Sequence, residues 1–346
     1  MEPEMFEALT PVSQMLARNL DVLTRQPLLV CGLLEDNLPA LLADAGPAPR
    51  IFTTDFRYFQ WQKSQGMTEI EFGTHPQPQQ AAALLLLMPK AKAEAEYLLA
   101  ACLPLLAVGG QVFIAGDNKG GVKSAPKLLA PYCDLVNKLD SARRASLYQA
   151  EIIRPAEPLV LSDWQKGYAL EKEQLQVCTL PGVFSAGHLD SGSRLLLDNL
   201  SPLKGRVLDF GCGAGVIGAS VLKRQPELML ECIDISALAL EATRLTLADN
   251  QLDANAKIYA SDGLSQVSGT FNHIIANPPF HAGLKTFYHT TETLLTSARD
   301  YLLPGGSLTL VANAFLPYPE LIEKSFGHCD TLAVNGKFKI YRATRR

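Results

Sequence analysis

The sequence predicts an α/β protein made of two similar halves, each built on a mostly parallel β-sheet. Short apolar runs alternate with amphipathic segments along the chain, which is the pattern of strands connected by helices. Three stretches of the first half also have counterparts in the second half. At 346 residues the chain is long enough for two domains, each with a core of its own.

The repeat is read from matching segments. Leu28–Gly32 aligns with Val207–Gly211, and the same offset sets Asp55 beside Asp234. A third pair matches at a larger offset, so the repeat contains insertions or deletions: Leu105–Ala115 and Tyr301–Val311. The sequence therefore predicts a duplicated α/β domain.

The seam between the halves is expected within residues 154–176. Arg154-Pro-Ala-Glu-Pro158 interrupts regular structure, and Trp164–Gln176 is mostly polar. We expect residues 1–160 to form the first domain and residues 165–346 the second.

Composition narrows the function classes. The chain is 47% hydrophobic and 19% charged, with a net charge of −4, so no overall basic character indicates a polyanion partner. The apolar run Ala81–Met88 is far shorter than the roughly 20 residues that span a bilayer. The seven cysteines form no C-x-x-C pair, which predicts reduced thiols and no metal site. We expect a cytoplasmic protein without a membrane segment.

The second half gives clear elements. Its predicted strands are Arg206–Phe210, Leu228–Ile233, Lys257–Ala260, Phe271–Ala276 and Ser307–Ala312. Its predicted helices are Val216–Arg224, Ala237–Asn250 and Thr290–Leu302. Pro304-Gly305-Gly306 is expected to end the last helix and to turn the chain into the fifth strand.

A glycine-rich turn follows the first of these strands. Gly211, Gly213 and Gly215 allow left-handed backbone and bring amide groups close to a nucleoside ligand at the carboxyl end of the sheet. Asp209 precedes the turn, where a carboxylate can face a cationic ligand. This acidic residue favours S-adenosylmethionine as the ligand.

Two further carboxylates follow the next strands. Asp234 is expected to accept hydrogen bonds from ribose hydroxyls, and Asp262-Gly263 to meet the adenine edge. The loop alone leaves an alternative open. Gly213–Gly218 also fits the G-x-G-x-x-G pattern of dinucleotide-binding proteins, with Asp234 at a suitable spacing.

The fourth strand ends in Asn277-Pro278-Pro279-Phe280. The prolines fix φ and remove amide donors, so nearby carbonyls stay available as acceptors. With the Asn277 side chain, they suit a planar amino group whose lone pair is delocalised. Accepting its N–H groups stabilises the charge that develops on the nitrogen, and Phe280 can stack on the ring. These four residues are the predicted catalytic group, with Asn277 also expected at the cofactor.

Together the two motifs resemble class I methyltransferases that act on exocyclic or amide nitrogens. Pro181–Leu197 and Asn277–Gly283 are similar to segments of bacterial ribosomal RNA guanine-N2 methyltransferases, and the duplicated layout is similar to the members that act on 16S rRNA. Ser193 stands where threonine is expected, a change that keeps the hydroxyl.

The resemblance implies two tandem Rossmann-like class I methyltransferase domains, the first degenerate and the second catalytic. It also implies S-adenosylmethionine as the methyl donor and N2-methylguanosine in 16S rRNA as the product. The substrate would be a small ribosomal subunit or its assembly intermediate. The first domain would serve folding or RNA docking.

The residues of the first half support a silent copy. Leu34 and Asp36 stand opposite Gly213 and Gly215, and side chains there obstruct a close approach of backbone to ligand. Only the Leu87–Lys90 region stands opposite the Asn-Pro-Pro-Phe motif.

Several residues are candidates for RNA contact. The predicted phosphate contacts are Lys119, Lys123, Lys127, Arg143 and Arg144, with a solvated loop as the alternative. His281 follows the catalytic motif and could touch the base or a phosphate. Phe184 and Asp190 are expected to shape the entrance to the site; the alternative is a capping turn before a helix that starts near Ser193.

Other functions remain open at this point. The same fold could methylate large-subunit rRNA guanine, adenine N6 or a protein glutamine, because the core motif does not distinguish these planar nitrogens. A non-catalytic RNA-binding assembly factor is the alternative from another class, although an intact glycine turn and Asn277 count against it.

Overall fold

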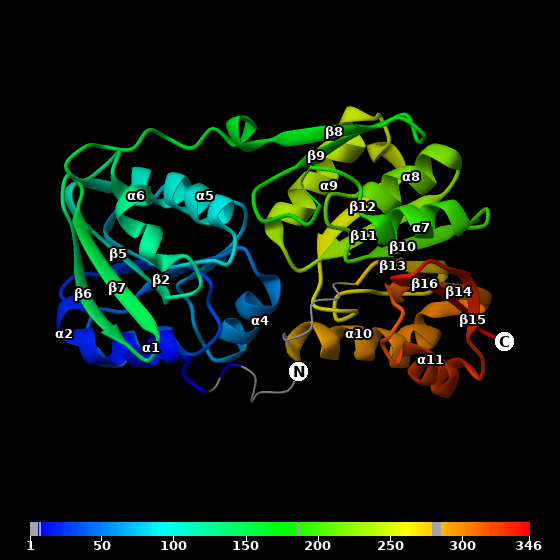
Figure 1. Cartoon of the computed structure of the whole chain (residues 1–346), viewed down its shortest axis with the longest axis horizontal. Helices are drawn as coiled ribbons and strands as arrows, with labels where there is room; N and C mark the ends of the chain where they lie inside the picture. Colours follow the sequence, from blue (N-terminus) through cyan, green and yellow to red (C-terminus); the bar gives the residue numbers. More distant parts are fainter. Residues whose placement is uncertain (1–5, 7, 186, 279–284) are drawn as a thin grey trace. The chain divides into compact units, whose positions relative to one another are not determined.

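The computed structural model describes residue 6 and residues 8–185, 187–278 and 285–346. The chain divides into two compact units, Met1–Trp164 and Gln165–Arg346 (Figure 1). In each unit, helices cover both faces of a central sheet. Among the described residues, no helix is both long and apolar enough to pass through a bilayer.

The first unit contains a seven-stranded sheet of order β3-β2-β1-β4-β5-β7-β6. Its strands are β1 Leu28–Gly32, β2 Arg50–Thr53, β3 Ile70–Phe72, β4 Ala81–Leu87, β5 Leu106–Asp117, β6 Val136–Ala142 and β7 Ala145–Glu151. Its helices are α1 Pro11–Leu16, α2 Leu20–Leu23, α3 Leu38–Ala45, α4 Phe56–Ser64, α5 Lys92–Cys102 and α6 Ala125–Leu129. The first five strands are parallel, and β7 is antiparallel to both of its neighbours.

The second unit repeats this order as β12-β11-β10-β13-β14-β16-β15. Its strands are β10 Arg206–Phe210, β11 Met229–Asp234, β12 Ala256–Ala260, β13 Phe271–Ala276, β14 Leu302–Asn313, β15 Asp330–Val334 and β16 Phe338–Thr344. Its helices are α7 Ser191–Asn199, α8 Val216–Arg224, α9 Ala237–Asp249, α10 Lys285–Ser297 and α11 Tyr318–Phe326. The identical topology confirms the predicted α/β duplication.

The central strands are apolar because the sheet is covered on both faces. In β13, Phe271, Ile274 and Ile275 are at most 1% exposed, and β10 lies beside β13 in parallel. The strand order reverses between β10 and β13, and in open α/β sheets ligands bind at the carboxyl ends of the strands beside such a reversal. Any ligand site of this unit is expected there.

The register defines which residues of the two copies correspond. Phe210 pairs with Ala276, so Gly211 and Asn277 follow at one level of the second sheet. At the equivalent level of the first sheet, Gly32 pairs with Leu87. Leu87 therefore takes the place of Asn277.

The predicted pairing of Asp55 with Asp234 is wrong. Val30 pairs with Ile51, and its counterpart Asp209 pairs with Cys232, which sets Thr53 in the place of Asp234. Asp55 instead caps α4, as Ser236 caps α9. The segment between the first two strands is shorter in the first copy, so a constant offset misaligns them.

Two other expectations change. Pro304-Gly305-Gly306 lies inside β14 and does not end a helix. The register between β13 and β14 shifts between Phe271 and His273, so a bulge accommodates the glycines within the strand. The polar part of the expected seam is an antiparallel hairpin, β8 Lys166–Leu170 and β9 Leu175–Thr179. Thr246 of α9 donates its hydroxyl to the Cys178 carbonyl (3.3 Å), so the hairpin packs on the second unit.

Candidate active site

The glycine-rich loop of the second unit connects β10 to α8 at the carboxyl edge of the sheet. Gly211 and Cys212 each donate a backbone amide to the Ile233 carbonyl at 2.9 Å. Gly211 and Gly213 have φ of 70° and 56°, in the left-handed region. Within the described part of the chain, nothing lies within 4 Å of where a Cβ would stand at either glycine. The loop backbone therefore borders open space.

The helices behind the loop approach it closely. A Cβ at Gly215 would lie 3.0 Å from the Thr243 side chain, and one at Gly218 would lie 2.9 Å from Oδ2 of Asp209. The Thr243 hydroxyl donates to the Gly213 carbonyl at 2.9 Å. Packing thus requires glycine at positions 215 and 218, and Thr243 fixes the loop.

Asp209 lies at the base of the loop and is 1% exposed. Its Oδ2 accepts the Gly218 amide at 2.8 Å, whereas its buried Oδ1 has no hydrogen-bond partner among the described residues. Burial raises the pKa of Asp209 to about 7; the Gly218 amide opposes this rise, and the Asp234 carboxylate adds to it. The site thus contains a buried acceptor suited to a cation or a donor. Its contact with the methyl donor stays a prediction.

Asp234 is oriented by the loop and by the start of α9. Its Oδ2 accepts the Gly213 amide at 3.0 Å, and its Oδ1 accepts the Ser236 amide at 2.9 Å. Each carboxylate oxygen can accept a second hydrogen bond, so ribose hydroxyls remain possible ligands. Ser261 donates its amide to the Asp234 carbonyl at 3.1 Å, which brings the Asp262-Gly263 turn beside Asp234. The nucleoside contacts stay predictions.

Asn277 directly follows β13 and contacts the start of α7. Its Nδ2 donates to Oγ of Ser193 at 2.7 Å and to Oδ2 of Asp190 at 3.3 Å. Pro278 is buried. The other predicted residues of this segment lie outside the described residues: Pro279, Phe280 and His281.

The upstream segment supplies the cap of α7. Oδ1 of Asp190 accepts the amides of Gly192 and Ser193 at 2.9 and 3.1 Å, which confirms the capping alternative for Asp190. The Phe184 side chain is 58% exposed. Its contact with substrate stays a prediction.

In the first copy the corresponding place is filled. Asp36, opposite Gly215, accepts hydrogen bonds from the Thr10 amide at 2.6 Å, the Ser13 hydroxyl at 3.0 Å and the Leu38 amide at 3.0 Å. The Tyr58 hydroxyl donates to the Asp36 carbonyl at 2.9 Å. Leu34, which stands opposite Gly213, is 7% exposed. The first copy therefore has a buried side chain at the position where the second copy has glycine.

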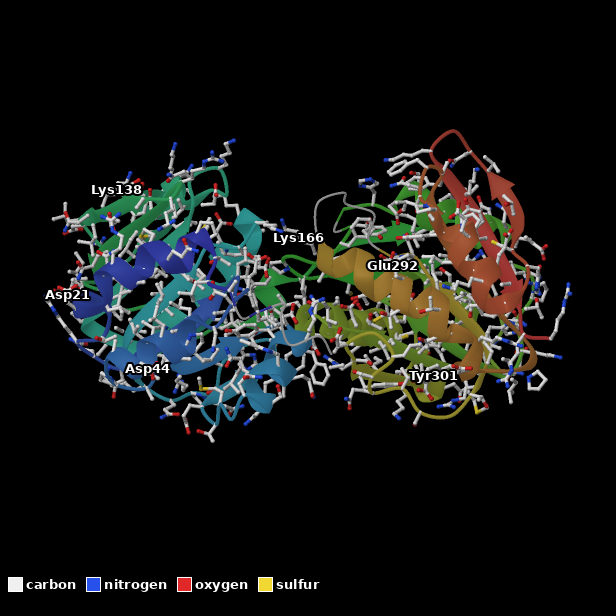
Figure 2. All side chains as sticks on the ribbon, turned by 90° about the horizontal axis from the view of Figure 1, so that it is seen from below. Asp21, Asp44, Lys138, Lys166, Glu292 and Tyr301 are labelled. Atoms are coloured by element: carbon white, nitrogen blue, oxygen red, sulfur yellow. The ribbon has the colours of Figure 1, made fainter. Side chains whose placement is uncertain are left out.

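Some of the predicted RNA contacts come together in the first unit. The Asn118 amide donates to the Arg144 carbonyl at 2.7 Å, and the Ser146 hydroxyl donates to Oδ1 of Asn118 at 2.6 Å. Lys119 therefore lies beside the turn of the β6–β7 hairpin, where Arg143 and Arg144 are exposed. Figure 2 shows Lys138 on the same hairpin.

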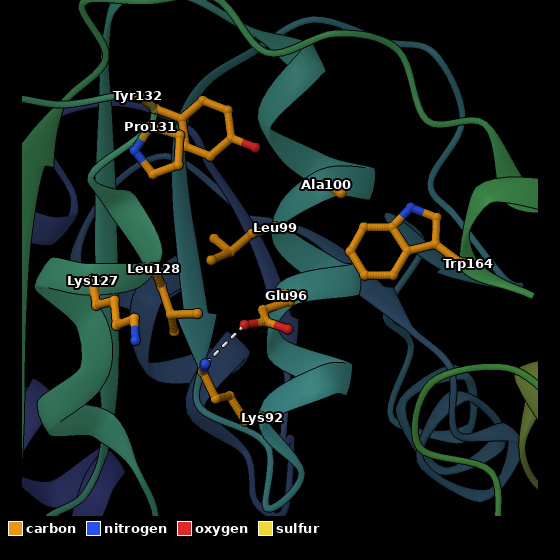
Figure 3. Close-up of a pocket in the computed structure, with 9 residues that line it drawn as sticks. All are labelled: Lys92, Glu96, Leu99, Ala100, Lys127, Leu128, Pro131, Tyr132 and Trp164. Carbon is orange, nitrogen blue, oxygen red and sulfur yellow. Dashed lines mark ion pairs between the residues drawn. The ribbon is translucent and has the colours of Figure 1, made fainter. Parts of the chain in front are cut away.

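Lys123 and Lys127 follow this loop. Lys123 is exposed in the short 3-10 helix Val122–Ser124, and Lys127 lies on α6. Lys127 lines a pocket of about 280 Å³ between α5 and α6, with Trp164 and Tyr132 among its other walls (Figure 3). Nζ of Lys92 in this pocket pairs with Glu96 at 3.1 Å, which reduces its attraction for anions.

Sequence reasoning missed three residues that organise the site. Ser193 contacts Asn277, Thr243 fixes the loop, and Gly218 admits the carboxylate of Asp209. The third glycine of the G-x-G-x-x-G pattern was a signal for Gly218, but no local pattern indicates the other two contacts. Among the described residues, His, Cys, Asp and Glu side chains form no group that could hold a metal ion.

Comparisons with known proteins cover both units. The methyltransferase small domain model matches residues 174–342, and the methyltransferase small domain N-terminal model matches residues 13–168. Ribosomal RNA small subunit methyltransferase C of Aeromonas hydrophila is 49% identical, over 97% of this chain and 99% of the relative. The protein of the same name from Photobacterium profundum is 44% identical, with the same coverage of both chains.

A solved structure shares the fold. A T. thermophilus 16S rRNA N2 methyltransferase, in complex with AdoMet and guanosine, is similar with a TM-score of 0.83 at 24% identity. The match covers 100% of this chain and 95% of that chain. The tandem arrangement of the two α/β units is therefore shared along the full length.

Proposed function

This chain belongs to the ribosomal RNA small subunit methyltransferase C family, and we propose that it methylates the exocyclic N2 amine of a guanine in 16S rRNA. S-Adenosylmethionine is the methyl donor, and the products are N2-methylguanosine and S-adenosylhomocysteine. The dinucleotide interpretation of the glycine loop is wrong, because the family is one of methyltransferases.

The second unit offers groups that fit the donor. Gly211 and Gly213 leave room along the loop, Asp209 retains a buried carboxylate oxygen, and Asp234 holds its carboxylate toward the loop. When bound, S-adenosylmethionine supplies an electron-poor methyl carbon on a positively charged sulfur. Asp209 and Asp234 would contact its polar groups, and Asp262-Gly263 its adenine.

The single observation that carries the catalytic assignment is the placement of Asn277 beside the glycine loop. The two segments end neighbouring strands at one level of the sheet. Acceptor oxygens at Asn277 and Pro278 would bind the N–H groups of the substrate amine and stabilise the positive charge that develops on its nitrogen. The nitrogen then loses a proton that has become acidic, so no strong base is needed.

The RNA partner is proposed to dock on the first unit. Lys119, Arg143 and Arg144 form an exposed basic group in a chain of net charge −4, and this group lies at the carboxyl edge of the sheet. Phosphate contacts by such side chains position an RNA without reading its sequence. Lys123 and Lys127 would extend this surface. We place the reaction in the cytoplasm, on a small subunit or its assembly intermediate.

The test is methyl transfer from labelled S-adenosylmethionine to small ribosomal subunits that lack the modification, followed by nucleoside analysis. N2-methylguanosine is the expected product. Asn277→Ala should reduce turnover by about 100-fold or more with little change in donor binding. Methylated adenine or protein would overturn the substrate assignment, and RNA binding without any transfer would indicate an assembly factor.

A further inference from the structure

The side-chain amide of Asn277 is held by the start of α7. Ser193 is 6% exposed, and its Oγ accepts Nδ2 of Asn277 at 2.7 Å. Asp190 divides its two oxygens between two tasks: Oδ1 accepts the backbone amides of Gly192 and Ser193, and Oδ2 accepts Nδ2 of Asn277 at 3.3 Å. One capping residue thus joins the helix to the catalytic segment.

This arrangement selects one of the two orientations of the amide. An asparagine amide can rotate by half a turn, which exchanges its oxygen and nitrogen. A carboxylate only accepts hydrogen bonds, so only the NH2 end of Asn277 can face Asp190. The oxygen of Asn277 is then directed away from α7, as an acceptor. The reversed amide would instead present an NH2 group to the NH2 group of the substrate.

We propose that Asp190 and Ser193 are positioning residues that hold the Asn277 oxygen toward the substrate amine. The proposal rests on the proposed function, in which Asn277 accepts from that amine. It reassigns Asp190 from the entrance of the site to the support of the catalytic amide, and it gives Ser193 a role in the rate of the reaction.

The first copy shows what the same helix start does without an amide to hold. Thr10 caps α1 as Asp190 caps α7, and Ser13 stands where Ser193 stands. The Ser13 hydroxyl donates to Asp36, because Leu87 occupies the place of Asn277. A hydroxyl three residues after the cap thus points to the carboxyl edge in both units, and Ser13 provides a matched control.

The sharpest variant is Asp190→Asn in the full-length protein. Asparagine caps helices as well as aspartate does, so its oxygen can keep the bonds to Gly192 and Ser193. Its NH2 group would then face Asn277 and favour the reversed amide. With saturating small subunits lacking the modification, we expect kcat to fall about 100-fold, with unchanged affinity for S-adenosylmethionine and an unchanged Tm.

A second series decides the question if Asp190→Asn lowers the Tm. Ser193→Ala should lower kcat about 10-fold, and Ser193→Thr, which keeps the hydroxyl, should restore it. Ser13→Ala removes the matching hydroxyl from the first unit and should leave kcat unchanged. If Ser193 served folding alone, its substitution would change the Tm, and kcat would not differ between Ser193→Ala and Ser193→Thr.

The outcomes separate the two claims. If Asn277→Ala abolishes turnover while Asp190→Asn and Ser193→Ala keep kcat within about threefold of wild type, the positioning role is wrong and the proposed function stands. If Asn277→Ala itself retains full turnover, the catalytic role of Asn277 is wrong and the positioning role fails with it. The proposed function fails instead if the wild-type protein forms no N2-methylguanosine in the small subunits.

Discussion

The two units share a strand order and a helix start, yet in the part of the chain that the structure describes only the second has a glycine turn with open space beside it at the carboxyl edge. Among the described residues, nothing lies within 4 Å of where a Cβ would stand at Gly213, whereas its counterpart in the first unit is Leu34, which is 7% exposed. Few residues account for the difference between the two carboxyl edges, because both units retain the sheet and the helices that cover it. The comparison teaches that a duplicated scaffold can lose its ligand site through side chains that occupy it.

The carboxylates of Asp36 in the first unit and Asp209 in the second have opposite effects on the free energy of unfolding. Asp36 receives three hydrogen bonds, each worth about 1 kcal/mol. Asp209 is instead buried with one oxygen lacking a partner among the described residues, an arrangement that costs stability. The first unit is therefore organised as a stable support, and the second keeps an unsatisfied group where a ligand is proposed to bind.

The largest expected effect comes from making the second loop like the first. Gly213→Leu introduces the residue found at Leu34 into left-handed backbone and into the open space. We expect the affinity for S-adenosylmethionine to fall by at least about 1000-fold, or ~4 kcal/mol, in isothermal titration calorimetry. Leu34→Gly should leave the binding stoichiometry at one per chain. A second binding site in that variant would contradict the filled first copy.

A smaller effect is expected from emptying the first copy. Asp36→Ala leaves the donors of Thr10, Ser13 and Leu38 without their acceptor, so the free energy of unfolding of the first unit should drop by about 3 kcal/mol. Both tryptophans of the chain lie in this unit, so their fluorescence during urea unfolding reports the loss. Donor binding by the second unit should not change. A loss of donor binding in this variant would mean that the two units unfold together.

The buried carboxylate of the second unit should make its stability depend on pH. The pKa of Asp209 is about 7 in the folded chain, against 3.8 ordinarily, so the folded state holds the proton more tightly. Protonated Asp209 therefore contributes to the free energy of unfolding in full below about pH 4. This contribution is lost as the pH rises to 7, at up to about 1.4 kcal/mol per pH unit. Asp209→Asn should remove this slope, as followed by circular dichroism during denaturant unfolding. If stability depended on pH with the same slope in the variant and the wild type, Asp209 would not be the source of this pH dependence.

The smallest expected effect concerns RNA docking on the first unit. Arg143→Ala with Arg144→Ala should weaken the binding of small subunits and flatten its salt dependence by about 0.9 in the log–log slope per lost phosphate contact. Arg25→Ala is a matched control, because Arg25 precedes β1 at the opposite edge of the same sheet. An unchanged slope in the double variant would remove this hairpin from the RNA-binding surface.

The sequence alone determined the local features. It located β10, β13 and α8 and the repeat itself, because burial periodicity and glycine conformation act over a few neighbouring residues. It also singled out the glycine loop and Asn277, because few structural roles need those residues in that order. The sequence did not predict the bulge in β14, because Pro-Gly-Gly is typical of both a turn and a bulge.

Only the tertiary structure decided how these features meet. Ser193 and Asn277 are 84 residues apart, and Asp190 and Asn277 are 87 apart, so no local pattern predicts that they contact each other. The hydrogen bonds that Asp36 accepts from Thr10 and Ser13 likewise depend on the packing of α1 against a distant loop. Such contacts arise when separate strands and helices pack side by side, and spacing along the chain carries no information about them.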